Sequence, residues 1–444
     1  MVDHAWSQLS PDEKVQRRFA AFVEPGLEFV SAEAAAEYRA RATRLKKAVL
    51  LEGEPDRVPV TVLTGYYPAA RKGLTPYDVM HDYELAAKTW LDCNLELQAD
   101  SMMAPNFAAI PGRAYETLDA KILSWPGHGI PKEAGFQYNE KEWMGADEYD
   151  LLIDDPTDFL LHDYLPRVAG GLSGLAKLAS PLDMIEIVAG PPWLMRWADP
   201  DVQASLECLR AAGQECAAWG GAIYPMLGRL VAEGFPGPFA HMSKAPFDVI
   251  GDTLRGTRGI LMDMFRQPEA LLEACDRLVP VMVKWVTRRA NPFTPPLVFM
   301  PLHKGADGFM SQEQFQKFYW PSLLRVIEGL VADGFVPYLF AEGAYGTRLE
   351  TIAQDVPKGR TVWQFDHTDM RRAKQILGGV ACIQGNVPIS MLQLGTPDEV
   401  TAYSRDLIEA VGPGGGFILD VGAVLDDYRE GNVEAMIQAA KNTI

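Results

Sequence analysis

The sequence lacks paired cysteines and lacks any apolar run long enough to cross a membrane. Five cysteines are spread along the chain of 444 residues, at Cys93, Cys208, Cys216, Cys275 and Cys382. None belongs to a Cys-x-x-Cys pair, so a disulfide framework is excluded and reduced thiols are expected. The first residues lack the apolar core of a secretion signal. We therefore expect a cytoplasmic protein that is not embedded in a membrane.

Positive charge is also scarce. The chain has 41 Lys and Arg residues against 59 Asp and Glu residues, which gives a net charge of −18 at pH 7. A field of this sign repels nucleic acid and anionic lipid, so neither is expected as a partner. A small anionic substrate held by a few local cations is compatible with it.

Two compact motifs are missing as well. No Gly-x-Gly-x-x-Gly opens a helix after a first strand, which disfavours a dinucleotide-binding domain. No His-x-x-x-His and no close cysteine pair offers a short zinc-binding motif. Any metal site must therefore be assembled from scattered residues.

The chain does contain a regular alternation of short apolar runs and segments with helical periodicity. Hydrophobic residues make up 48% of the sequence and charged residues 23%, as in a globular protein with a large core. Strands are expected at residues 58–63, 97–103, 238–242, 297–302, 336–341, 361–365, 381–384 and 416–419. Eight strands alternating with helices predict an α/β fold of the (β/α)8 TIM-barrel type.

The clearest unit of this pattern is residues 296–350. A buried strand at 297–302 leads through a polar loop into an amphipathic helix at 313–331, and a second strand at 336–341 ends at Glu342. Parallel strands connected in this way place their C-terminal loops on one rim. In a β/α barrel that rim carries the chemistry.

Three segments lie outside the barrel pattern. Residues 1–55 are helical and well charged, and we expect an N-terminal helical extension that caps the barrel domain of residues 56–444 or forms the arm of a homodimer. Residues 105–155 alternate in polarity and predict a hairpin insertion over the rim. Residues 154–235 predict several extra helices, used for a partner or as a lid.

Polar residues recur directly after the predicted strands. They are Asp100, His241, Lys244, His303, Lys304, Asp307, Glu342, Tyr345, Arg348, Asp366, His367, Asp369, Asn386 and Asp420. A single loop acid or histidine is more often a helix cap or a solvated charge. Recurrence at one end of several strands instead predicts a shared cleft. An acid within a strand also needs a partner or a function, which marks Asp100.

Nine of these residues are our candidates for the site. The catalytic candidates are Asp100, His303, Glu342 and Asp366. The candidates for substrate binding are His241, Lys304, Tyr345, Arg348 and Asn386. His303 and Glu342, with Asp366 or His367, are also candidate metal ligands, since imidazole and carboxylate groups suit zinc or iron. The alternative is an acid–base network in which a carboxylate positions a histidine to move a proton.

Four short motifs together carry a family resemblance. They are residues 245–268, which begin Ala-Pro-Phe-Asp, then Ala99-Asp100-Ser101, Gln384-Gly385-Asn386-Val387-Pro388, and residues 414–419. In combination they resemble the uroporphyrinogen decarboxylase superfamily, which also contains corrinoid-dependent methyltransferases. The resemblance extends over residues 56–444. It implies one β/α barrel with its cleft at the C-terminal rim.

The resemblance to the decarboxylases themselves is incomplete. In those enzymes an Arg-rich segment after the first strand holds the carboxylates of the substrate, and a strand-borne Asp, matched here by Asp100, addresses the pyrrole nitrogens. The corresponding segment here, residues 64–72, has only Arg71 and Lys72 as cations. A substrate with several carboxylates would need several bidentate arginines. Decarboxylation of a porphyrinogen is therefore the alternative and not the leading hypothesis.

The methyltransferase branch typically holds zinc with a His-x-Cys after the fifth strand and a Cys after the eighth. This chain has Phe340-Ala341-Glu342 and Val421-Gly422-Ala423 at those places, so no thiolate zinc site follows from the resemblance. Glu342 beside His303 is the remaining candidate pair of ligands. No cobalamin-binding domain is visible, so a corrinoid would be carried by a partner protein docked over the rim and residues 154–235.

The leading hypothesis is an enzyme that moves a methyl group from a small methylated donor, an aryl ether or an amine, to a separate corrinoid protein. His303 and Glu342, with or without zinc, would polarise the leaving heteroatom, because alkoxide and amide anions leave poorly. Asp100 and Asp366 would orient the substrate. The alternatives are decarboxylation of a porphyrinogen or related acid, and a non-catalytic barrel that binds a ligand.

Overall fold

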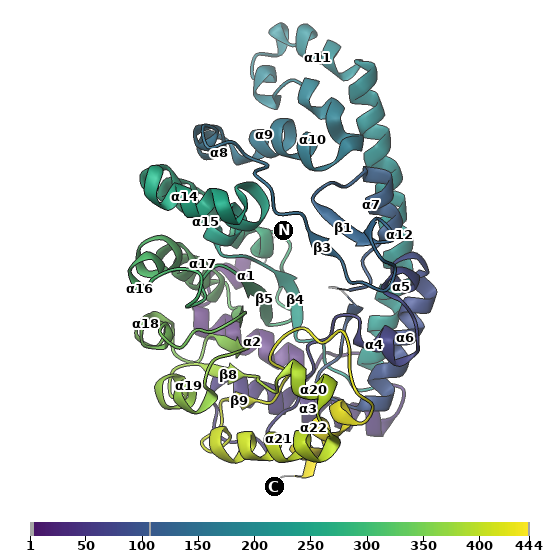
Figure 1. Ribbon diagram of the computed structural model, residues 1–444, viewed down its shortest axis with the longest axis vertical. Helices are drawn as coiled ribbons and strands as arrows, with labels where there is room; N and C mark the ends of the chain where they lie inside the picture. Colours follow the sequence, from purple (N-terminus) through teal and green to yellow (C-terminus); the bar gives the residue numbers. More distant parts are fainter. Residues whose placement is uncertain (1–3, 106–107, 443–444) are drawn as a thin grey trace.

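The computed structural model describes residues 4–105 and 108–442 (Figure 1). At the centre of the described part lies a six-stranded parallel sheet, in which each strand is hydrogen-bonded to the next one along the chain. Its strands are β4 (Phe239–Met242), β5 (Leu297–Leu302), β6 (Val336–Ala341), β7 (Val362–Phe365), β8 (Cys382–Gln384) and β9 (Phe417–Ile418). The six strands predicted from residue 238 onward are confirmed to within one residue at each end.

Helices connect these strands and form an outer layer around them (Figure 1). They are α13 (Pro246–Asp248), η6 (Val249–Leu254), α14 (Gly256–Arg266), α15 (Pro268–Thr287), α16 (Gln312–Gln314), η7 (Phe315–Tyr319), α17 (Trp320–Ala332), α18 (Leu349–Asp355), α19 (Met370–Leu377), α20 (Ile389–Leu394), α21 (Pro397–Val411) and α22 (Asn432–Asn442). In α17 the residues Leu323, Val326, Ile327 and Leu330 repeat at helical spacing, and all four are buried. The helix predicted at residues 313–331 is confirmed.

The first two predicted strands differ from the prediction. Residues 58–63 belong to no named strand, although Val60 forms an isolated parallel bridge with Leu419 of the segment after β9. The strand predicted from residue 97 does not start there, because helix α6 (Tyr83–Leu97) continues to that residue. The amide of Asp100 still donates to the carbonyl of Val60 at 2.8 Å. The fold is thus TIM-barrel-like, and closure by eight regular strands stays a prediction.

The N-terminal extension is helical, as predicted, and comprises α1 (His4–Ser7), α2 (Pro11–Val23) and α3 (Ala32–Leu50). Ser10 and Ser31 accept backbone hydrogen bonds as N-caps of α2 and α3. The buried faces of these helices join a core with side chains of the central strands, among them Phe299 and Tyr338. The extension therefore packs against the sheet, while its role in a homodimer and the boundary at residue 55 stay predictions.

The predicted hairpin insertion is confirmed as a small separate sheet of β1 (Leu123–Pro126), β2 (Gly129–Ile130) and β3 (Gln137–Tyr138). The neighbouring helices are α4 (Tyr67–Arg71), α5 (Pro76–His81), α7 (Gly112–Leu118) and α8 (Tyr149–Asp154). The extra helical layer is confirmed too: α9 (Pro156–Phe159), η2 (Leu160–Tyr164), α10 (Leu165–Val168), η3 (Gly170–Lys177), η4 (Pro181–Met184), η5 (Ile187–Ala189), α11 (Pro191–Trp197) and α12 (Pro200–Ala232). This layer projects beyond the barrel, with α11 at its tip (Figure 1).

The tip of this projection is apolar and exposed. Ile185, Val188 and Met195 are 83%, 80% and 73% accessible to solvent. In the described part of the chain, no helix combines the length and the apolar character that crossing a membrane requires. The exposed apolar side chains thus form a surface feature of the projection.

Asp100 lies in a buried ion-pair cluster and not at the rim beside His303. Its Oδ1 accepts from Arg44 at 2.7 Å and from Arg57 at 2.8 Å, and its Oδ2 accepts from Arg57 at 2.7 Å and from the Val60 amide at 2.8 Å. Arg44 belongs to α3, so the cluster fastens the N-terminal helices to the barrel. This placement corrects the expectation that Asp100 joins the catalytic cleft. A buried acid needs a charged partner, and Asp100 has two, Arg44 and Arg57.

This cluster generates a prediction for Asp100→Asn. The change leaves two arginines without their buried counter-charge, so we expect a loss of about 3–5 kcal/mol of stability. For a chain of this length that corresponds to a melting temperature lower by about 3–5 °C, measured by thermal denaturation.

The matched control is Asp56→Asn. Asp56 pairs with the same Arg44 at 2.6 Å, but its side chain is 65% exposed. An exposed pair contributes at most about 1 kcal/mol. Equal losses in the two variants would contradict the structural role of Asp100.

Candidate active site

Ionisable side chains gather where β4, β5 and β6 end. His303 follows β5 directly, Glu342 follows β6 directly, and Lys244 comes two residues after β4. The helical turn after β4, formed by α13 and η6, carries Asp248 and Asp252. Two residues four apart on a helix point to the same side. All five side chains thus come from the rim that parallel strands share, as the sequence predicts for His303 and Glu342.

His303 lies between two carboxylates. Its Nδ1 is 2.6 Å from Oδ2 of Asp252, and its Nε2 is 3.6 Å from Oε1 of Glu342. Asp252 also pairs with Lys244 at 2.6 Å and with Lys304 at 3.3 Å. With Asp252 held ionised by two lysines, Nδ1–H donates to it and the ring is oriented with Nε2 toward Glu342. We refer to His303, Glu342, Asp252, Lys244 and Lys304 as the rim cluster.

Asp248 holds the loop that carries His303. Its carboxylate accepts from the backbone N–H of His303 at 3.1 Å, from the backbone N–H of Lys304 at 2.9 Å, and from the hydroxyl of Tyr319 at 2.7 Å. Asp248 is fully buried. Because an unpaired buried carboxylate is costly, these three donors fix the start of the loop after β5.

The surroundings shift the pKa values of neighbouring groups in opposite directions. Burial alone would raise the pKa of Asp252, but His303 and Lys244 hold it well below its usual range. Burial raises the pKa of Glu342, with a further contribution from Asp366. Burial opposes protonation of His303, but the Asp252 carboxylate outweighs it and raises the pKa of the imidazole. The site therefore contains one firmly ionised acid and two groups that hold a proton more readily than usual.

The donor set of the rim cluster does not fit zinc. A zinc site needs at least three protein ligands whose donor atoms lie close together, and Asp252 and Glu342 instead contact different nitrogens of the His303 ring. Within residues 4–105 and 108–442, the one group of three ligating side chains with mutually close donor atoms lies elsewhere, at His81, Glu116 and His128. We therefore derive the chemistry of the rim from proton transfer alone.

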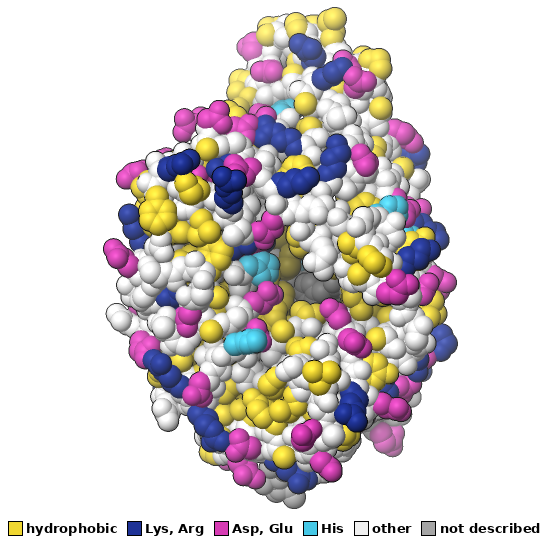
Figure 2. All heavy atoms as spheres, viewed as in Figure 1, with side chains coloured by type: hydrophobic (Ala, Val, Ile, Leu, Met, Phe, Trp, Pro, Cys, Tyr) yellow, Lys and Arg dark blue, Asp and Glu magenta, His cyan; other side chains and the backbone are white. Residues whose placement is uncertain are grey.

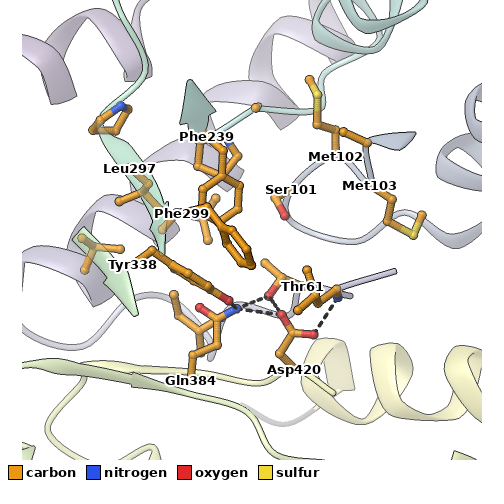
Figure 3. Close-up of a pocket in the computed structure, with 18 of the residues that line it drawn as sticks. Thr61, Ser101, Met102, Met103, Phe239, Leu297, Phe299, Tyr338, Gln384 and Asp420 are labelled. Atoms are coloured by element: carbon orange, nitrogen blue, oxygen red, sulfur yellow. Dashed lines mark hydrogen bonds between the residues drawn. The ribbon is translucent and has the colours of Figure 1, made fainter. Parts of the chain in front are cut away.

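An apolar cavity of about 360 Å³ lies inside the sheet, next to the N-terminal helices. Phe239, Phe299 and Tyr338 line one wall, and Met102 and Met103 lie across from them (Figure 3). None of the described residues that line the cavity is Lys or Arg. Figure 2 shows a central hollow with apolar side chains at its base and with histidine and acidic side chains beside it.

One side of the cavity is polar and internally hydrogen-bonded. Oδ2 of Asp420 accepts from the hydroxyl of Thr61 at 2.6 Å and from the amide of Gln384 at 2.7 Å (Figure 3). The same amide lies 2.7 Å from the hydroxyl of Tyr338. Burial raises the pKa of Asp420. This network offers hydrogen-bonding groups to the polar end of a ligand whose body is apolar.

Two predicted substrate-binding residues lie at these features. His241, in β4, lines the cavity, and its pKa is lowered by burial and by the charges of Arg18 and Arg289. Lys304 is buried in the rim cluster, and its Nζ donates to Glu140 of the hairpin insertion at 2.9 Å. Lys304 is thus already engaged by protein carboxylates.

The other three predicted substrate-binding residues stabilise loops instead. The hydroxyl of Tyr345 donates to the carbonyl of Leu302 at 3.2 Å. Arg348 donates to the carbonyls of Gly305 at 3.2 Å and Met310 at 2.6 Å. The side-chain amide of Asn386 donates to the carbonyls of Asp366 and Thr368. Buried backbone carbonyls need donors, and these side chains supply them at the rim.

Asp366 lies beside the loop that carries Glu342. Its Oδ2 accepts from the backbone N–H of Gly343 at 3.2 Å, and its Oδ1 is 3.3 Å from Nε2 of His367. Burial raises the pKa of Asp366. Asp366 thus lies near enough to Glu342 to affect its pKa, whereas the hydrogen-bond partners of the Asp100 side chain are Arg44, Arg57 and the Val60 amide.

Sequence reasoning missed Asp248 and Asp252 as site residues. Both lie within the motif of residues 245–268 that carries the family resemblance. Two acids at helical spacing directly after a barrel strand were the available signal. Their partners His303 and Lys304 are more than 50 residues away in the sequence, so local sequence patterns could not predict these pairings.

A parallel sheet with ionisable residues at the C-terminal strand ends is typical of TIM-barrel-like proteins. Residues 234–443 match the sequence model of the uroporphyrinogen decarboxylase family (URO-D). The uroporphyrinogen decarboxylase of Syntrophotalea carbinolica is 25% identical over 195 residues, which is 44% of this chain and 54% of that protein. That of Anaeromyxobacter dehalogenans is 30% identical over 135 residues, 30% of this chain and 37% of that protein.

The solved structure of a methyltransferase from Methanosarcina mazei superposes with a TM-score of 0.54 at 15% identity, over 90% of this chain and 97% of that chain. This likeness concerns the fold. Residues 234–443 thus carry the similarity to the uroporphyrinogen decarboxylase family, which confirms the resemblance seen in the sequence for that part of the chain. The matches to the curated decarboxylases cover about half of their length or less.

The rim cluster predicts how His303 titrates. Since Asp252 raises the pKa of His303, Asp252→Asn should lower it, as measured from the imidazole proton shifts across pH. Protonated His303 stabilises the folded state fully below the unfolded-state pKa of about 6.5, and this contribution is lost as pH rises through the higher folded-state value. Asp307→Asn is the control, because Asp307 pairs with Arg348. An unchanged His303 titration in Asp252→Asn would refute the assignment.

Proposed function

We propose that this protein transfers a methyl group from a small, largely apolar methylated donor to a corrinoid carried by a separate protein. The proposal rests on an apolar cavity lined by no Lys or Arg among the described residues, together with a rim cluster in which the pKa values of His303 and Glu342 are raised. An aryl methyl ether has this combination of an apolar body and an oxygen that must be protonated to leave.

The cavity supports the choice of donor. Its volume of about 360 Å³ lies at the lower end of the range for small-molecule sites, roughly 300–1,000 Å³. Phe239 and Tyr338 meet edge to face at 4.9 Å, and Phe299 stacks near Tyr338 at 5.8 Å, so an aromatic wall is already assembled. Asp420 and its hydrogen-bonded neighbours support the binding of a polar substituent on the ring.

The rim cluster supports the chemistry. In such a reaction the methyl group would pass to the reduced corrinoid as the accepting substrate, and the carbon–oxygen bond would break with departure of an aryloxide. Protonation of that oxygen lowers the barrier. Glu342 or the His303 imidazolium supplies the proton, and Asp252 stays ionised to stabilise and orient the imidazolium. The products are the methylated corrinoid and a phenol, so atoms and charge balance.

The extra helices support docking of a partner. The projection of α9–α12 exposes Ile185, Val188 and Met195, and exposed apolar side chains of this kind are typical of contact surfaces. It extends outward next to the hairpin insertion (Figure 1). The cavity would then bind the methyl donor, and the projection, a different part of the chain, would bind the partner protein.

Decarboxylation of a porphyrinogen is the alternative that the names of the curated relatives suggest. It requires cations that are free to bind the carboxylates of the substrate. Arg71 and Lys72, the cations nearest the expected position, are already paired. Arg71 contacts Glu434 at 2.5 Å, and Lys72 contacts Glu96 at 2.6 Å. This pairing favours methyl transfer over decarboxylation.

The proposal predicts that wild-type protein forms methylcobalamin from free cob(I)alamin and a methoxylated aromatic donor, followed by visible absorption and by release of the phenol. His303→Gln and Glu342→Gln should each lower kcat/KM by about 10²–10⁴-fold, as for loss of a general acid. Asp307→Asn should leave it within a few-fold. Release of carbon dioxide from uroporphyrinogen without methyl transfer would refute methyl transfer and select the alternative.

Metal content separates the proton-transfer role from a zinc role at the rim. If Glu342 only carries a proton, Glu342→Gln and wild-type protein should contain equal metal by elemental analysis while differing in activity. Loss of one metal equivalent in Glu342→Gln would contradict proton transfer and assign Glu342 as a ligand.

A further inference from the structure

Three ligating side chains meet at the contact between the hairpin insertion and helix α5, on elements that the catalytic proposal does not use. His81 is the last residue of α5, Glu116 belongs to α7, and His128 lies in the turn between β1 and β2. Nε2 of His81 and Nε2 of His128 lie 2.7 Å and 2.8 Å from the same atom, Oε1 of Glu116. The three donor atoms lie within 4.8 Å of one another.

The hydrogen bonding of His81 leaves its Nε2 in need of a cation or a second proton. Nδ1 of His81 lies 2.8 Å from the backbone carbonyl of Tyr77, so Nδ1 carries the hydrogen. A neutral ring then has a lone pair on Nε2, directed at an ionised carboxylate oxygen. Such a lone pair is available to bind a metal ion. Donation of Nδ1–H to a backbone carbonyl is the usual support of a metal-binding histidine.

Both rings are held in place by aromatic neighbours. His81 stacks on Tyr77 at 3.9 Å, and His128 stacks on Trp125 at 4.6 Å. The turn that carries His128 is closed by two backbone hydrogen bonds with Trp125, and Gly127 adopts a positive φ of 81° within it. At Gly112 an added Cβ would lie 2.7 Å from the His81 ring, so only glycine leaves room there. The site is thus preorganised from three separate elements.

We propose that His81, Glu116 and His128 bind one Zn²⁺ ion, which cross-links α5, α7 and the β1–β2 turn. Two imidazoles and one carboxylate form a recognised zinc ligand set, with water in the fourth position. The side chains of His81, Glu116 and His128 are 11%, 34% and 40% exposed, so one side of the site is open to solvent. The ion enters between the closely spaced donor atoms and replaces their direct contacts.

The cross-link has a structural consequence for the rim. It holds the sheet of β1, β2 and β3, and the chain that leaves β3 reaches Glu140, which contacts Lys304 of the rim cluster at 2.9 Å. The zinc ion therefore anchors the part of the insertion that precedes β3, and the contact between Glu140 and Lys304 anchors the part that follows β3. The inference does not depend on the reaction proposed above.

The first experiment measures zinc binding by the full-length chain, purified without a histidine tag and dialysed against EDTA. We expect one equivalent of Zn²⁺ to be taken up, and Co²⁺ added in its place to give visible d–d absorption. Glu116→Gln and His128→Asn should each weaken binding by about 100-fold or more, since each removes one of three ligands.

Two control variants locate the ion. His162→Asn removes a histidine that pairs with a carboxylate, Asp158 at 3.1 Å, in a pair that belongs to no three-ligand group in the described residues. It should keep the full equivalent, as should Glu342→Gln at the rim. Retention of zinc by Glu116→Gln and His128→Asn, or no uptake by wild-type protein, would overturn the proposal.

The second experiment uses stability, which stays informative if a variant binds poorly. At a zinc concentration about 100 times the dissociation constant, the melting temperature of the wild-type chain should rise by about 3 °C. The rise should be absent from Glu116→Gln and His128→Asn and present in His162→Asn. An equal rise in all four proteins would place the binding elsewhere and overturn the assignment.

Discussion

Two buried carboxylates on one helical turn hold the candidate active site together. Asp248 is fully buried, and the backbone amides of His303 and Lys304 are its donors, so the start of the loop after β5 is fixed by the need to pair that charge. Asp252, four residues on, then orients the His303 ring. The spacing of two acids on α13 and η6 thus decides where Nε2 of His303 lies relative to Glu342.

Three buried acids of this chain have different roles, and the side chains that contact each acid explain the difference. Asp100 is paired with two arginines and fastens the N-terminal helices to the barrel. Asp420 accepts hydrogen bonds from the neutral side chains of Thr61 and Gln384, and burial raises the pKa of Asp420. Asp252 has lysines on one side and His303 on the other, which keeps it ionised. Of the three, only Asp252 combines a fixed charge with a neighbour that can pass on a proton.

Four cations that were candidates for binding an anionic substrate are engaged by carboxylates of the protein itself. Lys244 and Lys304 pair with Asp252, and Arg71 and Lys72 pair with glutamates. In a chain with a net charge of −18, this leaves the cavity apolar and the rim rich in carboxyl groups. These features support the proposal of a neutral, apolar substrate.

From the sequence alone, β5 and β6 and the placement of His303 and Glu342 directly after them could be predicted, because apolar periodicity and strand ends are local properties. The family resemblance rested on equally local motifs. Only the tertiary structure decided that Asp100 is structural, since Arg44 and Arg57 lie 56 and 43 residues away from it. It likewise decided that Tyr345, Arg348 and Asn386 serve backbone carbonyls and that His81, Glu116 and His128 converge. Which charged groups contact each other depends on how distant segments pack. The hydrophobic periodicity of a sequence predicts local structure and does not predict such long-range contacts.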